Sequence, residues 1–135
     1  MTRVLGIDWG TKRVGVALSD EEGVLAFPLD VYPSGKRLLP LLRRIIDERG
    51  VSEVVVGESK DSRGAPNAIM KDIDAFRSEL EKCVNIPVAR EPEFMTSVHA
   101  DAIQGRIPKR DASAAALILQ RYLDRKNLER KKGGE

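Results

Sequence analysis

The stretch Val4-Leu-Gly-Ile-Asp-Trp-Gly-Thr-Lys-Arg-Val-Gly-Val-Ala-Leu-Ser-Asp20 consists of two apolar runs separated by a short polar turn. Residues 4–7 and 14–18 have the apolar and alternating patterns of two strands, and residues 9–12 supply the turn between them. Asp8 therefore ends a strand inside a hydrophobic frame. A carboxylate in that position must be solvated by a metal ion, by a ligand or by the hydrogen bonds of the turn itself. The last alternative is purely structural, because aspartate is common in turns.

The length and composition predict one globular domain with a sizeable core, since 41% of the 135 residues are hydrophobic and 33% are charged. We expect this domain to cover residues 1–130 and a flexible tail to follow at 131–135. The sequence has neither an apolar run of membrane-spanning length nor a signal-peptide pattern, which favours a cytoplasmic protein without membrane contact. Cys83 is the single cysteine and His99 the single histidine. An internal disulfide, a zinc cluster and most histidine-based catalysis are therefore excluded.

Charged side chains are unevenly distributed, although the net charge is only +2. Residues 50–101 contain ten acidic and six basic side chains, whereas residues 106–132 contain nine basic and three acidic ones. A basic C-terminal segment on a domain whose charges otherwise nearly cancel fits a polyanionic partner. The same charges would also be found on a solvated helix face followed by a frayed tail. Aromatic residues form only 4% of the chain, which argues against a platform for stacking single-stranded bases.

The remaining apolar patterns predict further strands and helices in alternation. Pro28 indicates that the strand containing it lies at a sheet edge or carries a bulge. The expected strands cover residues 24–32, 51–57 and 86–90, and the expected helices cover about 38–49, 66–82, 95–104 and 111–128.

This order predicts an α/β fold of the ribonuclease H-like type. Three strands that pair as hairpins, followed by strands connected through helices, form a mixed five-stranded sheet, three strands antiparallel and the rest parallel, with helices on both faces. The ends of the first, fourth and fifth strands then meet at one edge, where ligands bind in open α/β sheets. Actin-like phosphotransferases share such a first hairpin, but they need two domains around a nucleotide, and 135 residues form one.

Three stretches carry a more specific resemblance. They are the first hairpin, Ile86-Pro-Val-Ala-Arg-Glu-Pro-Glu-Phe-Met-Thr-Ser-Val98, and Lys109-Arg-Asp-Ala-Ser-Ala-Ala-Ala-Leu-Ile-Leu-Gln-Arg-Tyr-Leu-Asp124. Together they resemble the YqgF (RuvX) family of pre-16S rRNA nucleases, which is related to RuvC-type Holliday junction resolvases. The resemblance covers nearly the whole chain. It implies a hydrolase that cuts phosphodiester bonds in structured nucleic acid, processing the 5′ end of pre-16S rRNA in ribosome biogenesis.

The resemblance also implies catalytic and metal-binding roles for Asp8, Glu93 and Asp111. Three neighbouring carboxylates raise one another's pKa unless a cation neutralises them, and their hard oxygen atoms suit Mg²⁺ or Mn²⁺. Each acid has a structural alternative, because Asp111 would also cap a helix and Glu93 would also be an ordinary solvated loop residue. Glu91 competes with Glu93 for the same role.

The chain departs from the family pattern around Glu93, where Pro92 and Phe94 stand in place of the family's aspartate and arginine. Arg90 is a candidate replacement for that arginine. Trp9, beside Asp8, is expected either to stack on a base or to belong to the core. The candidate substrate-binding residues, which could contact phosphates, are Thr11, Lys12, Arg63, Asn67, Arg90, Lys109 and Arg110.

The expected partner is therefore a nucleic acid, with RNA favoured over DNA, bound by a monomer or a homodimer. Three alternatives stay open at this point. The first is a DNA nuclease that cuts four-way junctions with the same acids, and the second is a nucleic-acid-binding protein that keeps the fold without catalysis. The third is a small actin-like phosphate-binding protein, which the chain length disfavours.

Overall fold

The structure is a computed structural model that describes residues 3–10, 12–58, 69–92 and 110–133. A five-stranded mixed sheet runs through it in the order β3-β2-β1-β4-β5. The first three strands pair antiparallel, and β1, β4 and β5 pair parallel, which confirms the predicted topology. The strands are β1 (Arg3–Asp8), β2 (Arg13–Ser19), β3 (Ala26–Pro33), β4 (Val51–Glu58) and β5 (Val88–Pro92).

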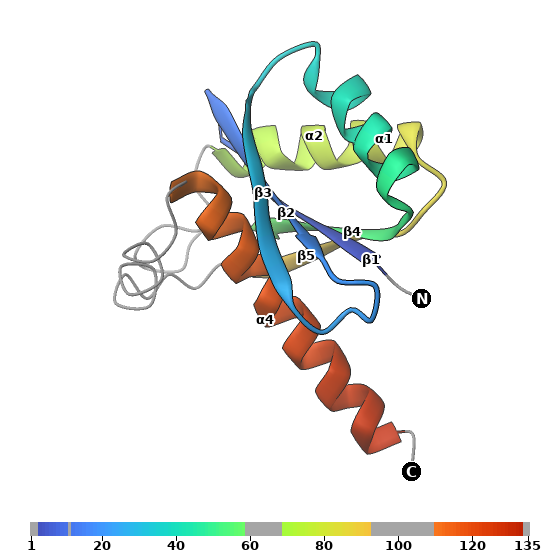
Figure 1. Ribbon diagram of the computed structural model, residues 1–135. Coiled ribbons are helices and arrows are strands. Elements are labelled where there is room, and N and C mark those ends of the chain that lie inside the picture. Colours follow the sequence, from blue (N-terminus) through green and yellow to red (C-terminus); the bar gives the residue numbers. More distant parts are fainter. Residues whose placement is uncertain (1–2, 11, 59–68, 93–109, 134–135) are drawn as a thin grey trace.

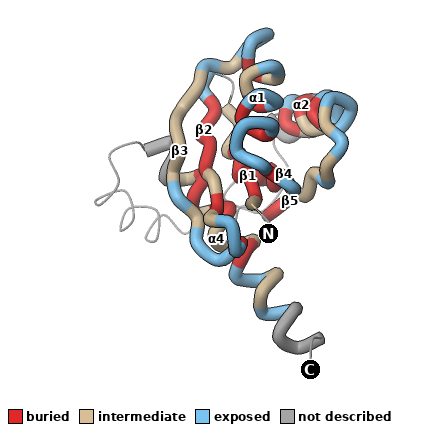
Figure 2. The backbone as a smooth tube through the Cα atoms, turned by 45° about the vertical axis from the view of Figure 1, so that its right-hand side comes forward, coloured by how far each residue is buried: buried red, intermediate tan, exposed pale blue. Residues whose placement is uncertain are grey.

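Helices cover both faces of the sheet (Figure 1). One face carries α1 (Leu38–Arg49) and α2 (Ile69–Cys83), and the opposite face carries α4 (Arg110–Gly133). Each face has its own apolar core, and Figure 2 shows the buried strands β1, β2 and β4 between them. Among the described helices, none is long and apolar enough to cross a lipid bilayer.

Alternation along β1 decides which face each of its side chains meets. Leu5 and Ile7 belong to the core beneath α1 and α2, whereas Val4 belongs to the core beneath α4. Gly6 also faces α4, because a Cβ atom at this position would lie 2.7 Å from the Cβ atom of Leu119. Side chains alternate between the two faces of a strand, so Asp8 follows Gly6 on the α4 side.

The packing of α4 depends on a second glycine, in β4. A Cβ atom at Gly57 would lie 2.5 Å from Cδ1 of Ile118. Gly6 and Gly57 therefore let the helix approach two neighbouring strands more closely than any other residue would. This close approach fixes the position of α4 over the end of β1.

Most predicted elements agree with the structure to within a few residues. Pro28 lies in β3, which is an edge strand, and the β2–β3 register shifts between Val16 and Ala17, next to the pair that Ala17 forms with Pro28. The last helix is longer than predicted, because it continues to Gly133 through much of the segment expected as a tail. The helix predicted over residues 95–104 lies outside the described residues.

Candidate active site

Asp8 lies at the carboxyl edge of the parallel part of the sheet. It is the last residue of β1, and the neighbouring parallel strands end at Glu58 and Pro92. The Asp8 side chain is partly buried. Carboxyl ends of parallel strands are the usual place for ligands in open α/β sheets. The sequence therefore predicted correctly that Asp8 stands where these strand ends meet.

Asp111 is the second residue of α4, and its side chain lies outside the described residues. Residues Ala115, Leu119 and Leu123 of this helix are buried against the sheet at intervals of four residues. Ala115 and Leu119 are the residues that a Cβ atom at Gly6 of β1 would meet, so this part of α4 lies over the second half of β1.

The direction of α4 brings its N-terminus to the edge of the sheet at which Asp8 lies. Gln120 of α4 binds the backbone of Val24 and Ala26, where β3 begins. Lys126, farther along the helix, contacts Glu53 near the start of β4. Both contacts lie toward the edge opposite Asp8, because β3 and β4 each begin there. The first residues of α4 are therefore the ones nearest to the Asp8 edge.

The third predicted acid, Glu93, lies outside the described residues, immediately after the end of β5. Its competitor Glu91 is 3% exposed and faces α4. Arg125 of α4 holds it with two contacts, Nη2 at 2.5 Å from Oε1 and Nη1 at 3.1 Å from Oε2. The Glu91 carboxylate is thus engaged in attaching β5 to α4, a role that the sequence pattern did not reveal.

Several candidate substrate contacts can be located, although their roles remain predictions. Lys12 is exposed in the turn between β1 and β2. Arg90 lies on the α2 side of the sheet, with Nη1 3.7 Å from Oδ1 of Asp74, and therefore does not share a face with Asp8 and Glu91. Arg110 begins α4, but its side chain is not described. Thr11, Arg63, Asn67 and Lys109 lie outside the described residues.

Trp9 belongs to the core on the α1 and α2 side. Its ring centroid lies 6.2 Å from that of Phe76 in α2, with the ring planes tilted by 33°. This contact favours the core alternative for Trp9, since consecutive residues of a strand point to opposite faces and Asp8 points toward α4.

A second polar cluster joins α4 to β4, and sequence reasoning did not identify it. The Tyr122 hydroxyl donates a hydrogen bond to Glu53, and Nζ of Lys126 lies 2.5 Å from Oε1 of the same carboxylate. Burial, followed by the bond to Glu53, raises the pKa of Tyr122. The spacing of Tyr122 and Lys126 places them on one helix face, but nothing local indicates that Glu53, 69 residues from Tyr122, is their partner.

The donor set predicted at the Asp8 edge is chemically suitable for a hard divalent cation. Carboxylate oxygen atoms are the protein ligands that Mg²⁺ and Mn²⁺ prefer. Within the described part of the chain, no three acidic, histidine or cysteine side chains are grouped as metal ligands. Asp8 is the only one of the three predicted acids whose side chain falls in that part.

Curated proteins resemble the chain over nearly its whole length. A relative from Dictyoglomus turgidum, named "putative pre-16S rRNA nuclease", is 35% identical over 139 residues, which cover 96% of this chain and 99% of the relative. A relative of the same name from Geobacillus kaustophilus is 38% identical over 136 residues, covering 92% of this chain and 99% of its own.

A solved structure has the same fold. Thermus thermophilus RuvC in complex with a Holliday junction substrate superposes with a TM-score of 0.64 at 15% identity, covering 93% of this chain and 96% of RuvC. The family model described as RuvX, Holliday junction resolvase, matches residues 2–125. With this match and the nearly full-length relatives at 35% and 38% identity, the chain belongs to the RuvX family.

Proposed function

We propose that this protein is a metal-dependent nuclease that hydrolyses phosphodiester bonds in structured RNA, with Asp8, Glu93 and Asp111 as its catalytic carboxylates. The position of Asp8 carries the proposal. This acid ends β1, the central strand of the sheet, on the face covered by α4, at the edge toward which the N-terminus of α4 points. A nuclease is also what membership of the RuvX family supports.

In this mechanism, the three carboxylates would hold one or two divalent cations. Bound Mg²⁺ or Mn²⁺ would polarise the phosphodiester, lower the pKa of the attacking water and stabilise the leaving oxygen. Asp8 would contribute an oxygen ligand from the end of β1, where Asp8 pairs with Gly15 of β2 and the preceding residue, Ile7, pairs with Val56 of β4. Asp111 contributes one from the first turn of α4, and Glu93 one from the segment after β5. The basic residues Lys12, Lys109 and Arg110 neutralise the phosphates on either side of the cut.

The names of the relatives support pre-16S rRNA as the substrate. Within this proposal the cut lies at the 5′ end of that RNA, and the protein acts in the cytoplasm in ribosome biogenesis. A second candidate is the cleavage of four-way DNA junctions. It is supported by the description of the family and by the RuvC fold seen in complex with a Holliday junction. RNA and DNA substrates differ in helix geometry and in the 2′-hydroxyl, so a direct comparison separates the two candidates.

The decisive experiment is cleavage of an end-labelled pre-16S rRNA fragment, alongside a four-way DNA junction, in Mg²⁺, Mn²⁺ or EDTA. We expect the wild-type protein to cut the RNA only with metal, and Asp8→Asn and Asp111→Asn to cut at least 100-fold more slowly. Asp47→Asn is the matched control, because Asp47 is exposed on α1 and far along the chain from the proposed acids.

Cleavage of the junction and not of the RNA would favour the second candidate. Undiminished metal-dependent cleavage by Asp8→Asn would overturn the assignment of the catalytic acids. Tight, metal-independent binding of RNA without any cleavage would mean that the chain binds nucleic acid and is not an enzyme.

A further inference from the structure

A group of exposed cations lies beside the proposed active site, on the loop between β3 and α1. Lys36 and Arg37 are exposed there, and Arg44 of α1 lines the same hollow of about 640 Å³. The floor of the hollow is apolar, with Leu38 and Leu41 among its lining residues. None of the described residues that line it is acidic. We refer to Lys36, Arg37 and Arg44 as the β3–α1 cationic surface.

This surface is attached to the turn that follows Asp8. The Ser34 hydroxyl donates a hydrogen bond of 2.6 Å to the carbonyl oxygen of Gly10, and the Ser34 amide donates one of 3.0 Å to the carbonyl oxygen of Lys12. In the sheet, Arg13 at the start of β2 pairs with Pro33 at the end of β3. The loop is therefore held at the same sheet edge as Asp8, on its β2–β3 side.

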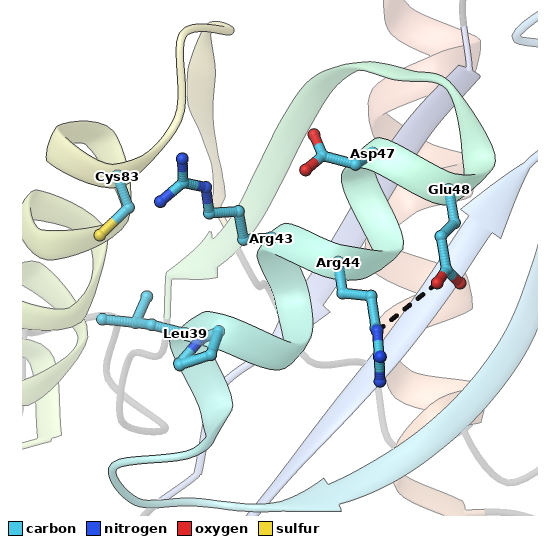
Figure 3. A pocket seen from close by; sticks show the side chains of 7 residues that line it. Leu39, Arg43, Arg44, Asp47, Glu48 and Cys83 are labelled. Atoms are coloured by element: carbon cyan, nitrogen blue, oxygen red, sulfur yellow. Dashed lines mark ion pairs between the residues drawn. The ribbon is translucent and has the colours of Figure 1, made fainter.

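Neighbouring hollows have a different charge pattern. The hollow between Trp9 and Phe76 is lined by the carboxylates Asp72 and Glu79, and none of its other lining residues in the described part of the chain is charged. A third hollow, between α1 and α2, is lined by Arg43 and Arg44 together with Asp47 and Glu48. Figure 3 shows Arg44 turned toward Glu48. Nε of Arg44 lies 3.5 Å from Oε1 of Glu48. Among the described residues that line these three hollows, all the charged ones at the β3–α1 loop are basic, which is not so in the other two.

We propose that the β3–α1 cationic surface binds the phosphodiester backbone of the substrate on one side of the scissile bond, extending the active site along the β2–β3 side of the sheet edge. The inference rests on the proposed nuclease function. Lys36 and Arg37 have no carboxylate partner among the described residues, and the ion pair of Arg44 is an exposed one, worth little in water. All three charges are available to a polyanion, and Ser34 holds their loop in place before the substrate arrives.

The test is the salt dependence of RNA binding in EDTA, which prevents cleavage. The variant Lys36→Gln/Arg37→Gln is compared with Arg49→Gln/Lys82→Gln, which removes two exposed charges where α1 and α2 end. The slope of log K against log salt is negative, and each lost phosphate contact reduces its magnitude by about 0.7–0.9. For Lys36→Gln/Arg37→Gln we expect the magnitude of this slope to fall by about 1.4–1.8 and the affinity for RNA to weaken roughly tenfold or more at 0.1 M salt. For the control variant we expect no change in slope or affinity.

The two proposals fail in different ways. If the wild-type protein binds and cuts RNA, and Lys36→Gln/Arg37→Gln has the same salt slope and affinity as the control, the β3–α1 surface is not a binding site and the nuclease function stands. If the wild-type protein neither binds nor cuts RNA or a DNA junction, both proposals are wrong. Circular dichroism of each variant establishes that the substitutions leave the fold intact.

Discussion

Tyr122 is partly buried and has charged side chains around it. Its hydroxyl donates to Glu53, and its ring lies 5.7 Å from Nζ of Lys126 and 5.8 Å from the guanidinium carbon of Arg125. Burial and the neighbouring carboxylate disfavour the phenolate, so the pKa of Tyr122 is raised above its ordinary value of 10.0. The hydrogen bond that attaches α4 to Glu53 of β4 therefore depends on the Tyr122 hydroxyl keeping its proton.

This linkage predicts a pH dependence of stability in the alkaline range. Below pH 10 Tyr122 is protonated in both the folded and the unfolded chain, and the hydrogen bond to Glu53 contributes fully. Above pH 10 the unfolded chain loses the proton while the folded protein retains it, so the free energy of unfolding falls as pH rises. Urea unfolding between pH 8 and 11 should therefore show a steeper loss for wild type than for Tyr122→Phe. Parallel curves would contradict the raised pKa.

At the scale of elements, the placement of α4 depends on two kinds of contact. Gly6 and Gly57 allow the helix close to β1 and β4, while the pairs Glu91–Arg125 and Glu53–Lys126 tie it to β5 and β4. Ion pairs at the margin of a core add little to the free energy of unfolding, and their main effect is to fix how the two elements are oriented. The close glycine contacts are therefore the part whose loss should cost most.

We expect Gly6→Ala to destabilise the protein by about 1–3 kcal/mol and Gly57→Ala by less. A Cβ atom at position 6 would meet the Cβ atom of Leu119 and the carbonyl oxygen of Ala115, which cannot move without moving the helix. A Cβ atom at position 57 would meet mainly Cδ1 of Ile118, the end of a side chain. Urea denaturation measures both losses.

A double-mutant cycle provides the control for this prediction. Ile118→Val removes the Cδ1 atom and alone should cost about 0.5–1.5 kcal/mol. Combined with Gly57→Ala, it should cost less than the sum of the two single changes, because the 2.5 Å contact with Cδ1 is gone. Strict additivity would show that the closeness of α4 to Gly57 is not what makes glycine necessary there.

At the scale of the whole molecule, the proposed site is assembled from a strand end, a post-strand segment and a helix start that are distant in sequence. Binding of a cation to these three acids would couple the elements, since a ligand that binds only the folded state stabilises it. Removal of one acid should weaken this coupling.

We therefore expect Mn²⁺ at about ten times its dissociation constant to add about 1.4 kcal/mol, which corresponds to a rise in Tm of about 5 °C. Asp8→Asn should show much less of this rise, and Asp47→Asn should retain all of it. Differential scanning calorimetry gives all six values. An equal rise in wild type and Asp8→Asn would place the cation elsewhere.

The sequence by itself determined the order of elements, the mixed sheet and the position of Asp8 at the end of β1. These follow from local patterns, because apolar alternation, helical spacing, glycine and proline act over a few residues. The turn at residues 9–12 and the edge character of β3 were predictable for the same reason. The length of α4 was underestimated, since its last turns project beyond the sheet and have no apolar periodicity to reveal them (Figure 1).

The tertiary structure alone decided which side chains meet. It paired Glu91 with Arg125 across 34 residues and Glu53 with Lys126 across 73, and it turned Trp9 toward Phe76. It also brought the cations of the β3–α1 loop beside the Asp8 turn through Ser34 and Gly10. No local pattern encodes such pairs, because partners far apart in the chain are selected only when sheet register and helix packing bring them within contact distance.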